Sequence, residues 1–169
     1  IFIIGGDRVK LGLISDTHDH VVHIRKAMAR FHQLGVERIV HAGDYGSPAA
    51  VFALEGIDAW GVLGNNDGEI KGLEHAFDRI GGVLFGTVGE FSFSGGKGAI
   101  YHGTLLTVRE ALIHSGRYGL VILGHTHVPR DQWIGQTRVL NPGTAHGFDK
   151  EATVMVFDDT DGTAELFRL

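Results

Sequence analysis

The chain has 169 residues, of which 43% are hydrophobic and 21% are charged, and this composition predicts a single globular domain over residues 1–169. Its 15 basic and 20 acidic residues give a net charge of −5, which argues against binding of nucleic-acid polymers. The absence of cysteine excludes a disulfide scaffold, a thiolate nucleophile and cysteine-based metal sites. No apolar run of 18 residues and no secretory signal is visible, so we expect no membrane partner and favour a cytoplasmic location.

The first half of the chain alternates short apolar runs with amphipathic segments. Strands are predicted at residues 9–15, 38–41 and 58–63. Helices are predicted between and after them, at residues 21–34, from Pro48 onward and at 69–80. In the first helix the apolar side chains recur every three or four positions, and Gly35 ends it. This order predicts parallel strands joined by crossover helices.

Beyond Gly82 the pattern changes to short strands. They are predicted at residues 83–88, 90–94, 99–101, 120–123, 132–134, 138–140, 153–157 and 164–167, with one helix over 108–115. The glycine-rich turn 95–98 predicts a hairpin. The expected fold class is therefore α/β, with two facing mixed β-sheets flanked by helices.

Polar side chains follow five of these strands directly. The five clusters are Ser15–His18, Gly43–Asp44, Gly64–Asp67, His102–Gly103 and Gly124–His127. Open α/β sheets bind ligands at the carboxyl ends of their strands, so the clusters can meet at one edge. Taken singly, an Asp or Asn there is a turn residue and a His is a surface or hydrogen-bonded residue. Together, and with Asp and His two residues apart in the first cluster, they predict a metal site.

The order Asp-x-His, Gly-Asp, Gly-Asn-x-Asp, His-Gly and Gly-His-x-His resembles the calcineurin-like metallophosphoesterases. The resemblance runs from about Lys10 to the C-terminus and leaves residues 1–8 outside. The segments SDTHDH (15–20), GNNDGE (64–69), GHTH (124–127) and NPGT (141–144) are most similar to the small bacterial and archaeal phosphodiesterases of that superfamily. The resemblance implies a four-layer αββα sandwich and metal-dependent hydrolysis of small phosphodiesters.

The resemblance also implies a pair of divalent metal ions. The ligands it implies are Asp16, His18 and His127 for the first ion, Asn65, His102 and His125 for the second, and Asp44 as a bridge. Such mixed ligation suits Mn, Fe, Ni, Co or Zn, with Mn favoured, better than Mg or Ca. A water bridging the ions would become hydroxide near neutral pH and attack phosphorus in line. With only two anionic ligands, the site would keep a positive charge that attracts phosphate.

The sequence departs from the resembled pattern beside these ligands. Many relatives carry a general-acid His where this chain has Asn66, with an acidic residue behind it, here Asp67. We expect Asn66 and Asp67 to be the catalytic residues, although an amide cannot deliver a proton. Either the substrates have good leaving groups or His20 acts as the acid. Asn66, His20 and Tyr45 are the expected substrate contacts, and Thr104 stands where relatives often have another His.

The remaining histidines are expected to be structural or solvated. His41 either orients Asp44 or is a satisfied strand residue, and His146 follows the NPGT turn, which we interpret as structural. Solvated positions are expected for His23, His32, His75 and His114.

A non-catalytic interaction scaffold is the rival interpretation. The resemblance extends to the small subunit of retromer, a scaffold protein, and a fold alone does not decide function. The presence of every implied metal ligand favours an enzyme. Exposed edge strands would allow a homo-oligomer, but no residue pattern requires one.

Overall fold

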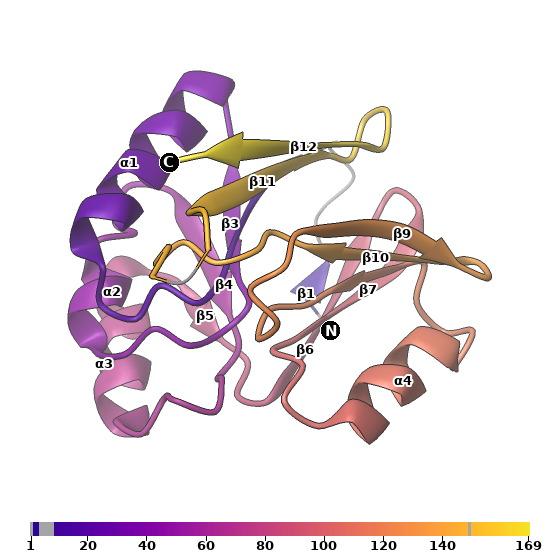
Figure 1. Cartoon of the computed structure of the whole chain (residues 1–169), viewed down its shortest axis with the longest axis horizontal. Helices are drawn as coiled ribbons and strands as arrows, with labels where there is room; N and C mark the ends of the chain where they lie inside the picture. Colours follow the sequence, from indigo (N-terminus) through magenta and orange to yellow (C-terminus); the bar gives the residue numbers. More distant parts are fainter. Residues whose placement is uncertain (1, 4–8, 149) are drawn as a thin grey trace.

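Two six-stranded β-sheets lie face to face in the computed structural model, which describes residues 2–3, 9–148 and 150–169 (Figure 1). The first sheet contains, in spatial order, β12 (Thr163–Arg168), β11 (Thr153–Asp158), β2 (Lys10–Ile14), β3 (Arg38–His41), β4 (Asp58–Gly61) and β5 (Val83–Leu84). Strands β2 to β5 are parallel, whereas β11 and β12 pair antiparallel at the other edge. The predicted parallel strand order of the first half is confirmed.

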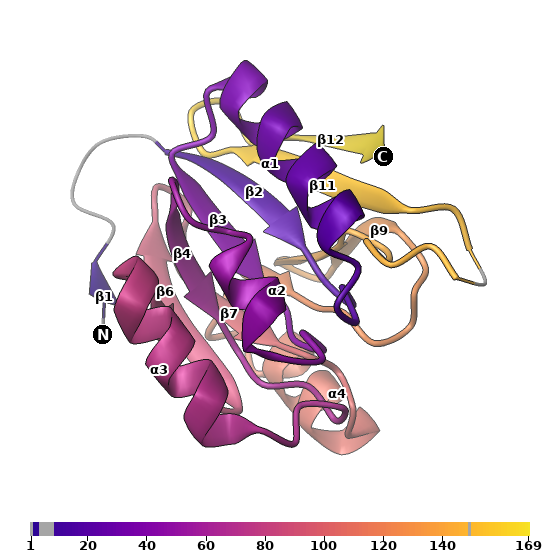
Figure 2. The ribbon, with the colours of Figure 1, turned by 90° about the vertical axis from the view of Figure 1, so that its left-hand side faces the viewer.

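Three helices connect the parallel strands and cover the outer face of this sheet (Figure 2). They are α1 (Val21–Leu34), α2 (Pro48–Phe52) and α3 (Ile70–Ile80). Gly35 ends α1 in the left-handed conformation, with φ of 69°. The proline of α2 stands in its first turn, and the hydroxyl of Ser47 accepts a hydrogen bond from Ala49 N as its N-terminal cap. Both helix ends agree with the sequence predictions.

The second sheet is built mostly from hairpins. Its spatial order is β1 (Phe2–Ile3), β6 (Val88–Phe93), β7 (Gly96–Tyr101), β8 (Leu120–Ile122), β10 (Thr137–Asn141) and β9 (Arg130–Ile134). β6 pairs antiparallel with β7, and β9 with β10, while β7, β8 and β10 run parallel. The crossover from β7 to β8 carries α4 (Leu106–His114), which packs on the outer face. The four-layer arrangement is therefore the expected one.

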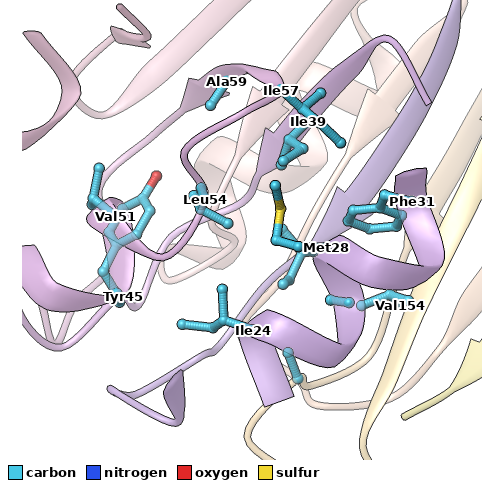
Figure 3. Close-up of a cluster of buried hydrophobic side chains, with 14 of the residues drawn as sticks. Ile24, Met28, Phe31, Ile39, Tyr45, Val51, Leu54, Ile57, Ala59 and Val154 are labelled. Atoms are coloured by element: carbon cyan, nitrogen blue, oxygen red, sulfur yellow. The ribbon is translucent and has the colours of Figure 1, made fainter. Parts of the chain in front are cut away.

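Strand alternation divides the core into layers. Leu13 of β2 and Ile100 of β7 point into the cluster between the two sheets. Ile39 of β3 points outward instead, to a cluster that includes Ile24 and Phe31 of α1 (Figure 3). Apolar packing thus holds both sheets rigid up to their carboxyl ends, where the polar clusters begin.

Three details differ from the predictions. The segment predicted as one strand over 83–88 divides between β5 and the start of β6, because the chain passes there from one sheet to the other. The hairpin turn is confined to Ser94 and Gly95, since Gly96 already pairs with Phe93. Of residues 1–8, the described Phe2–Ile3 form β1 parallel to β6, a strand that was not predicted.

Candidate metal centre

Five loops converge at the carboxyl ends of β2, β3, β4, β7 and β8, and backbone hydrogen bonds fix their relative positions. Asp16 N donates to Gly43 O at 3.0 Å, which joins the loops after β2 and β3. Gly124 N donates to His102 O at 2.9 Å, which joins the loops after β8 and β7. The two sheets are linked by the imidazole of His102, whose Nδ1 lies 2.7 Å from Ala42 O. The polar clusters therefore meet in one place.

One group of potential ligand atoms comes from Asp16, His18 and His127. One ligand atom of each residue lies within 4.8 Å of the others. His127 Nε2 is 3.2 Å from Asp16 Oδ1, and the rings of His18 and His127 are edge to face at 6.0 Å. The structure therefore brings together the set that the resemblance implies for the first ion.

A second group surrounds His102. Its Nε2 lies 3.4 Å from Asp44 Oδ2, 4.0 Å from Asp16 Oδ1 and 3.1 Å from Asn65 Oδ1. The ring of His125 is 5.1 Å from that of His102. Asn65, His102 and His125 are therefore neighbours as predicted, and Asp16 is shared between both groups.

Asp44 occupies the position between the two groups. Its Oδ2 is 3.6 Å from His18 Nε2 and 3.4 Å from His102 Nε2, one histidine from each set. Asn66 holds this carboxylate through two hydrogen bonds, from its backbone N to Oδ1 at 2.9 Å and from its Nδ2 to Oδ2 at 2.7 Å. A carboxylate fixed in this way is suited to bridging two cations.

The carboxylate of Asp16 is buried, and one of its oxygens accepts no hydrogen bond from the described residues. The residue is fully buried, and its Oδ2 accepts hydrogen bonds from Ser15 Oγ at 2.5 Å and from His125 N at 3.0 Å. Within the described part of the chain, Asp16 Oδ1 has no hydrogen-bond partner. A buried carboxylate oxygen without a partner is energetically costly. With imidazole nitrogens and further carboxylate and amide oxygens around it, the donor set fits a borderline divalent ion.

Mutual electrostatic effects perturb the pKa values of this cluster. Burial disfavours the charged form of Asp44, but the hydrogen bond and charge of His102 outweigh it and lower the pKa of Asp44. Burial likewise opposes the charge on His102, yet Asp44 and Asp16 raise its pKa above the ordinary value. For His125, burial and the neighbouring His102 lower the pKa. The carboxylates of Asp16 and Asp44 thus stabilise positive charge at His102.

Backbone strain is concentrated in the same loops. Among the residues that the structure describes, six that are not glycine have φ in the left-handed region, and five of them are predicted ligands. The five are Asp16 (53°), His18 (40°), Asp44 (60°), His125 (68°) and His127 (55°). Each such residue costs about 1 kcal/mol or more relative to ordinary backbone. Strain of this kind is typical of functional sites, where side-chain direction outweighs local stability.

Two glycines of the sequence motifs allow the close approach of these loops. A Cβ on Gly64 would collide with the Asp44 carboxylate, and one on Gly124 would collide with the hydroxyl of Ser15. In the Gly-Asn and Gly-His pairs, the glycine therefore allows the close packing of the loops, and the residue after it supplies the polar side chain.

Asp67, which was predicted to be catalytic, binds the backbone of two loops. Asp67 is buried, and its carboxylate accepts hydrogen bonds from the backbone N–H groups of Asp44 (2.9 Å), Tyr45 (2.7 Å), Gly46 (3.3 Å) and Gly64 (2.7 Å). These four hydrogen bonds come from the backbone of the loops after β3 and β4. Asp67 is therefore a positioning residue, since it holds in place the loops that carry Asp44 and the two asparagines.

The expected substrate contact of Tyr45 is also wrong. Its side chain is fully buried in the cluster beneath α2, 3.9 Å from the ring of His41 and 5.6 Å from that of Phe77 (Figure 3). The backbone of Asp44 directs the carboxylate to the site, and the next side chain turns into the core. A phenol ring enclosed in this way cannot reach a substrate.

His41 is a satisfied core residue that connects two of the loops. Its Nδ1 accepts a hydrogen bond from Gly43 N at 3.1 Å, and its Nε2 lies 3.0 Å from Thr17 Oγ1. Burial lowers the pKa of His41 to about 3, with a further contribution from His102. The ring is therefore neutral, and its proton on Nε2 is donated to Thr17.

The rim beside His18 contains histidines whose positions the sequence did not predict. The ring of His146 lies 5.4 Å from that of His18 and 5.8 Å from that of His20. His20 accepts a hydrogen bond from His23 N through Nδ1, as the cap of α1, and stacks on the His23 ring at 3.8 Å. His23, expected to be solvated, contacts Ala145 O at 2.9 Å through Nδ1. Nothing local in the sequence signals this cluster, because it forms only when α1 meets the turn after β10.

The remaining two expectations concern a turn and a threonine. Asn141 donates from Nδ2 to Gly124 O at 2.8 Å and accepts from Gly143 N at 2.9 Å, so the structural interpretation of the NPGT turn is confirmed. Thr104 Oγ1 donates to Asn65 Oδ1 at 3.3 Å. Thr104 therefore contacts a predicted ligand, although it replaces the His found in many relatives.

Comparisons with known proteins agree with this geometry. The family model of the calcineurin-like phosphoesterase superfamily domain matches residues 9–162. The phosphodiesterase MJ0936 of Methanocaldococcus jannaschii is 35% identical over 143 residues, which are 83% of this chain and 86% of that protein.

Solved structures show the same relationship. A structure described as a novel archaeal phosphodiesterase superposes with a TM-score of 0.89 at 31% identity, covering 95% of this chain and 99% of its own. Vps29 of Entamoeba histolytica has a TM-score of 0.67 at 18% identity, over 95% of this chain and 98% of its own, which shows a shared fold alone. Among the described residues, no helix is long and apolar enough to cross a membrane.

Proposed function

The chain belongs to the calcineurin-like phosphoesterase superfamily, a group of phosphoric ester hydrolases, and from this premise we propose that it is a phosphodiesterase of small substrates that uses two divalent metal ions. The proposal takes residues 1–169 as one catalytic domain. The observation that carries it is the buried Oδ1 of Asp16, which accepts no hydrogen bond from the described residues and lies 3.2 Å from His127 Nε2 and 4.0 Å from His102 Nε2.

Seven side chains would hold the ions. Asp16, His18 and His127 would bind one, His102, His125 and Asn65 the other, and Asp44 would bridge them, since its Oδ2 lies near a histidine of each set. When bound, the ions would activate a water molecule for attack on phosphorus and neutralise charge on the phosphoryl oxygens. Mn, Fe, Ni, Co and Zn suit this donor set, and Mn is the ion we would test first.

The other polar residues would position the reactants. Asn66 is exposed beside Asp44 and would donate a hydrogen bond from Nδ2 to a phosphate oxygen. Since an amide cannot protonate a leaving oxygen, we expect substrates with good leaving groups. His20 faces the same rim with Nδ1 engaged as the cap of α1, so only its Nε2 would be available to a substrate. Asp67 would act through the loops it holds.

The test compares metal-dependent hydrolysis in the wild type and in Asp44→Asn. Metal-stripped protein is assayed with bis(p-nitrophenyl) phosphate and with p-nitrophenyl phosphate, and Mn, Ni, Fe, Co, Zn and Mg are added back separately. We expect the diester to be hydrolysed with a transition ion. Asp44→Asn should bind less metal and lose about 100-fold in kcat, because it removes a charge-stabilising group.

The control is Glu74→Gln, an exposed carboxylate on α3, which should match the wild type in activity and metal content. Full activity and full metal content in Asp44→Asn would show that Asp44 is not the bridge. The leaving-group argument is tested by a series of aryl methyl phosphates. A flat dependence of kcat on the pKa of the leaving phenol would contradict the absence of an acid.

No specific observation favours the scaffold interpretation. The likeness to Vps29 concerns the fold, at 18% identity. The relative that is described as a phosphodiesterase is 35% identical to this chain, which favours the hydrolase.

A further inference from the structure

An open pocket of about 400 Å³ adjoins the metal centre on the side of Asn65. One wall contains Leu63 and Asn65 of the loop after β4 and Ile70 at the start of α3. The other contains Tyr101 at the end of β7 and Leu105, the N-cap of α4. The segments that form both walls lie at the lower edge of the molecule in Figure 1. Because Asn65 is also 3.1 Å from His102 Nε2, the pocket and the metal centre share a wall.

The pocket presents apolar side chains to solvent beside an ionic site. Ile70 is 44% exposed and Leu105 is 61% exposed, although both are large hydrophobic residues. Burial of apolar surface drives binding at about 25 cal/mol per Å², so these side chains gain free energy when a ligand covers them. Pockets of this volume with mostly apolar walls and a few polar groups are typical of small-molecule sites.

The wall is also held in a fixed shape. Leu105 N donates to Tyr101 Oη at 2.7 Å, and Tyr101 itself is buried. Thr104 Oγ1 donates to Asn65 Oδ1 at 3.3 Å, which ties the two walls together next to the centre. A pocket with walls fixed by hydrogen bonds loses little free energy in ordering when it binds a ligand.

These contacts limit what the pocket can accept. A phosphodiester bound at the metal centre carries two ester groups, and one placed on the Asn65 side would enter this pocket. An aryl or branched alkyl group there would bury apolar surface against Leu63, Ile70 and Leu105, and Thr87 and Thr104 are polar residues of the same lining.

Building on the proposed function, we infer that the pocket lined by Leu63, Ile70 and Leu105 binds an apolar ester group of the substrate, so that the enzyme selects phosphodiesters with one apolar alcohol. Leu105 and Ile70 are then specificity-determining residues. They act on the affinity for the ester group and leave the ligands of the metal centre unchanged.

The test measures binding of two diesters that differ only in the apolar group. Diphenyl phosphate and diethyl phosphate are titrated separately into the full chain loaded with Zn²⁺ and into the metal-free chain, with dissociation constants from NMR chemical shifts. We expect diphenyl phosphate to bind more tightly than diethyl phosphate, and Leu105→Ala and Ile70→Ala to weaken diphenyl phosphate by about five- to tenfold with little change for diethyl phosphate. Leu106→Ala is the matched control, since Leu106 is 59% exposed and adjacent in sequence but does not line the pocket.

Each outcome bears on the inference separately from the proposed function. Equal affinity for the two diesters, or an unchanged preference in both pocket variants, overturns the pocket assignment even if the enzyme hydrolyses diesters. If the protein binds diphenyl phosphate more tightly than diethyl phosphate, loses this preference in Leu105→Ala and hydrolyses no diester, the pocket assignment is supported. The proposed function is then wrong. If Leu105→Ala changes the molecular mass in sedimentation and leaves the preference intact, the surface joins two copies of the chain and the inference fails.

Discussion

Replacement of Asp67 by asparagine tests whether this residue acts on the reactants or on the loops. The carboxylate of Asp67 is only 6% exposed and accepts four backbone hydrogen bonds, two on each oxygen. In Asp67→Asn one oxygen becomes an NH₂ group, so one buried and one half-buried N–H group lose their acceptor whichever way the amide is oriented.

The magnitude follows from these contacts. A buried donor without an acceptor costs about 1–3 kcal/mol and a half-buried donor costs less, so the free energy of unfolding should fall by at least about 1–3 kcal/mol. A domain of this size has about 5–15 kcal/mol in total, so the variant is expected to fold but to unfold at much lower urea concentration. Metal affinity should fall as well, because the loops that carry Asp44 and Asn65 are no longer fixed.

Urea unfolding followed by circular dichroism gives the change in stability, and calorimetry gives metal affinity on the folded fraction. Asp78→Asn is the control, since Asp78 is an exposed carboxylate on α3, and its stability should stay within about 0.5 kcal/mol of the wild type. The reasoning is refuted if Asp67→Asn keeps the stability and metal content of the wild type. Loss of kcat alone, with both unchanged, would restore the catalytic role that the sequence predicted.

Two further predictions concern the loops around the centre. The pKa of His41 is 6.5 in the unfolded chain and about 3 when buried, so the unfolded state binds more protons between these values and stability is lost as pH falls below 6.5. At pH 5.5 this loss is about 1.4 kcal/mol relative to pH 8, and His41→Gln should show a pH dependence of unfolding that is shallower by this amount. An identical pH profile in both proteins would contradict the assignment of a neutral His41. Gly64→Ala should lose metal affinity and about 1–3 kcal/mol of stability, because its Cβ collides with the Asp44 carboxylate, whereas Gly68→Ala, with nothing within 4 Å of its Cβ, should match the wild type. Mass spectrometry measures the metal content of each variant, and thermal unfolding measures its stability. A Gly64→Ala protein that binds its full complement of metal would disprove the packing requirement.

Local patterns in the sequence predicted most of the helices and strands and the polar loops that form the site. The period of apolar residues defined α1 over Val21–Leu34, and the order of strands and helices defined the parallel half of the first sheet. Because parallel strands end at a common edge, the polar residues that follow β2, β3 and β4 had to be neighbours, as had those that follow β7 and β8. The two groups meet because the sheets lie face to face, and this was implied by the resemblance and not by any local pattern.

Only the tertiary structure decided what each side chain in these loops faces. Asp44 and Tyr45 are adjacent, yet one points to the centre and the other into the core. Asn66 and Asp67 are likewise adjacent, and one is exposed beside the carboxylate while the other binds buried backbone. Side-chain direction in a loop depends on its φ and ψ angles, and at Asp44 the backbone adopts the left-handed region with φ of 60°. Such a conformation is imposed by contacts between distant segments and not by the local sequence, so no local pattern could have predicted it.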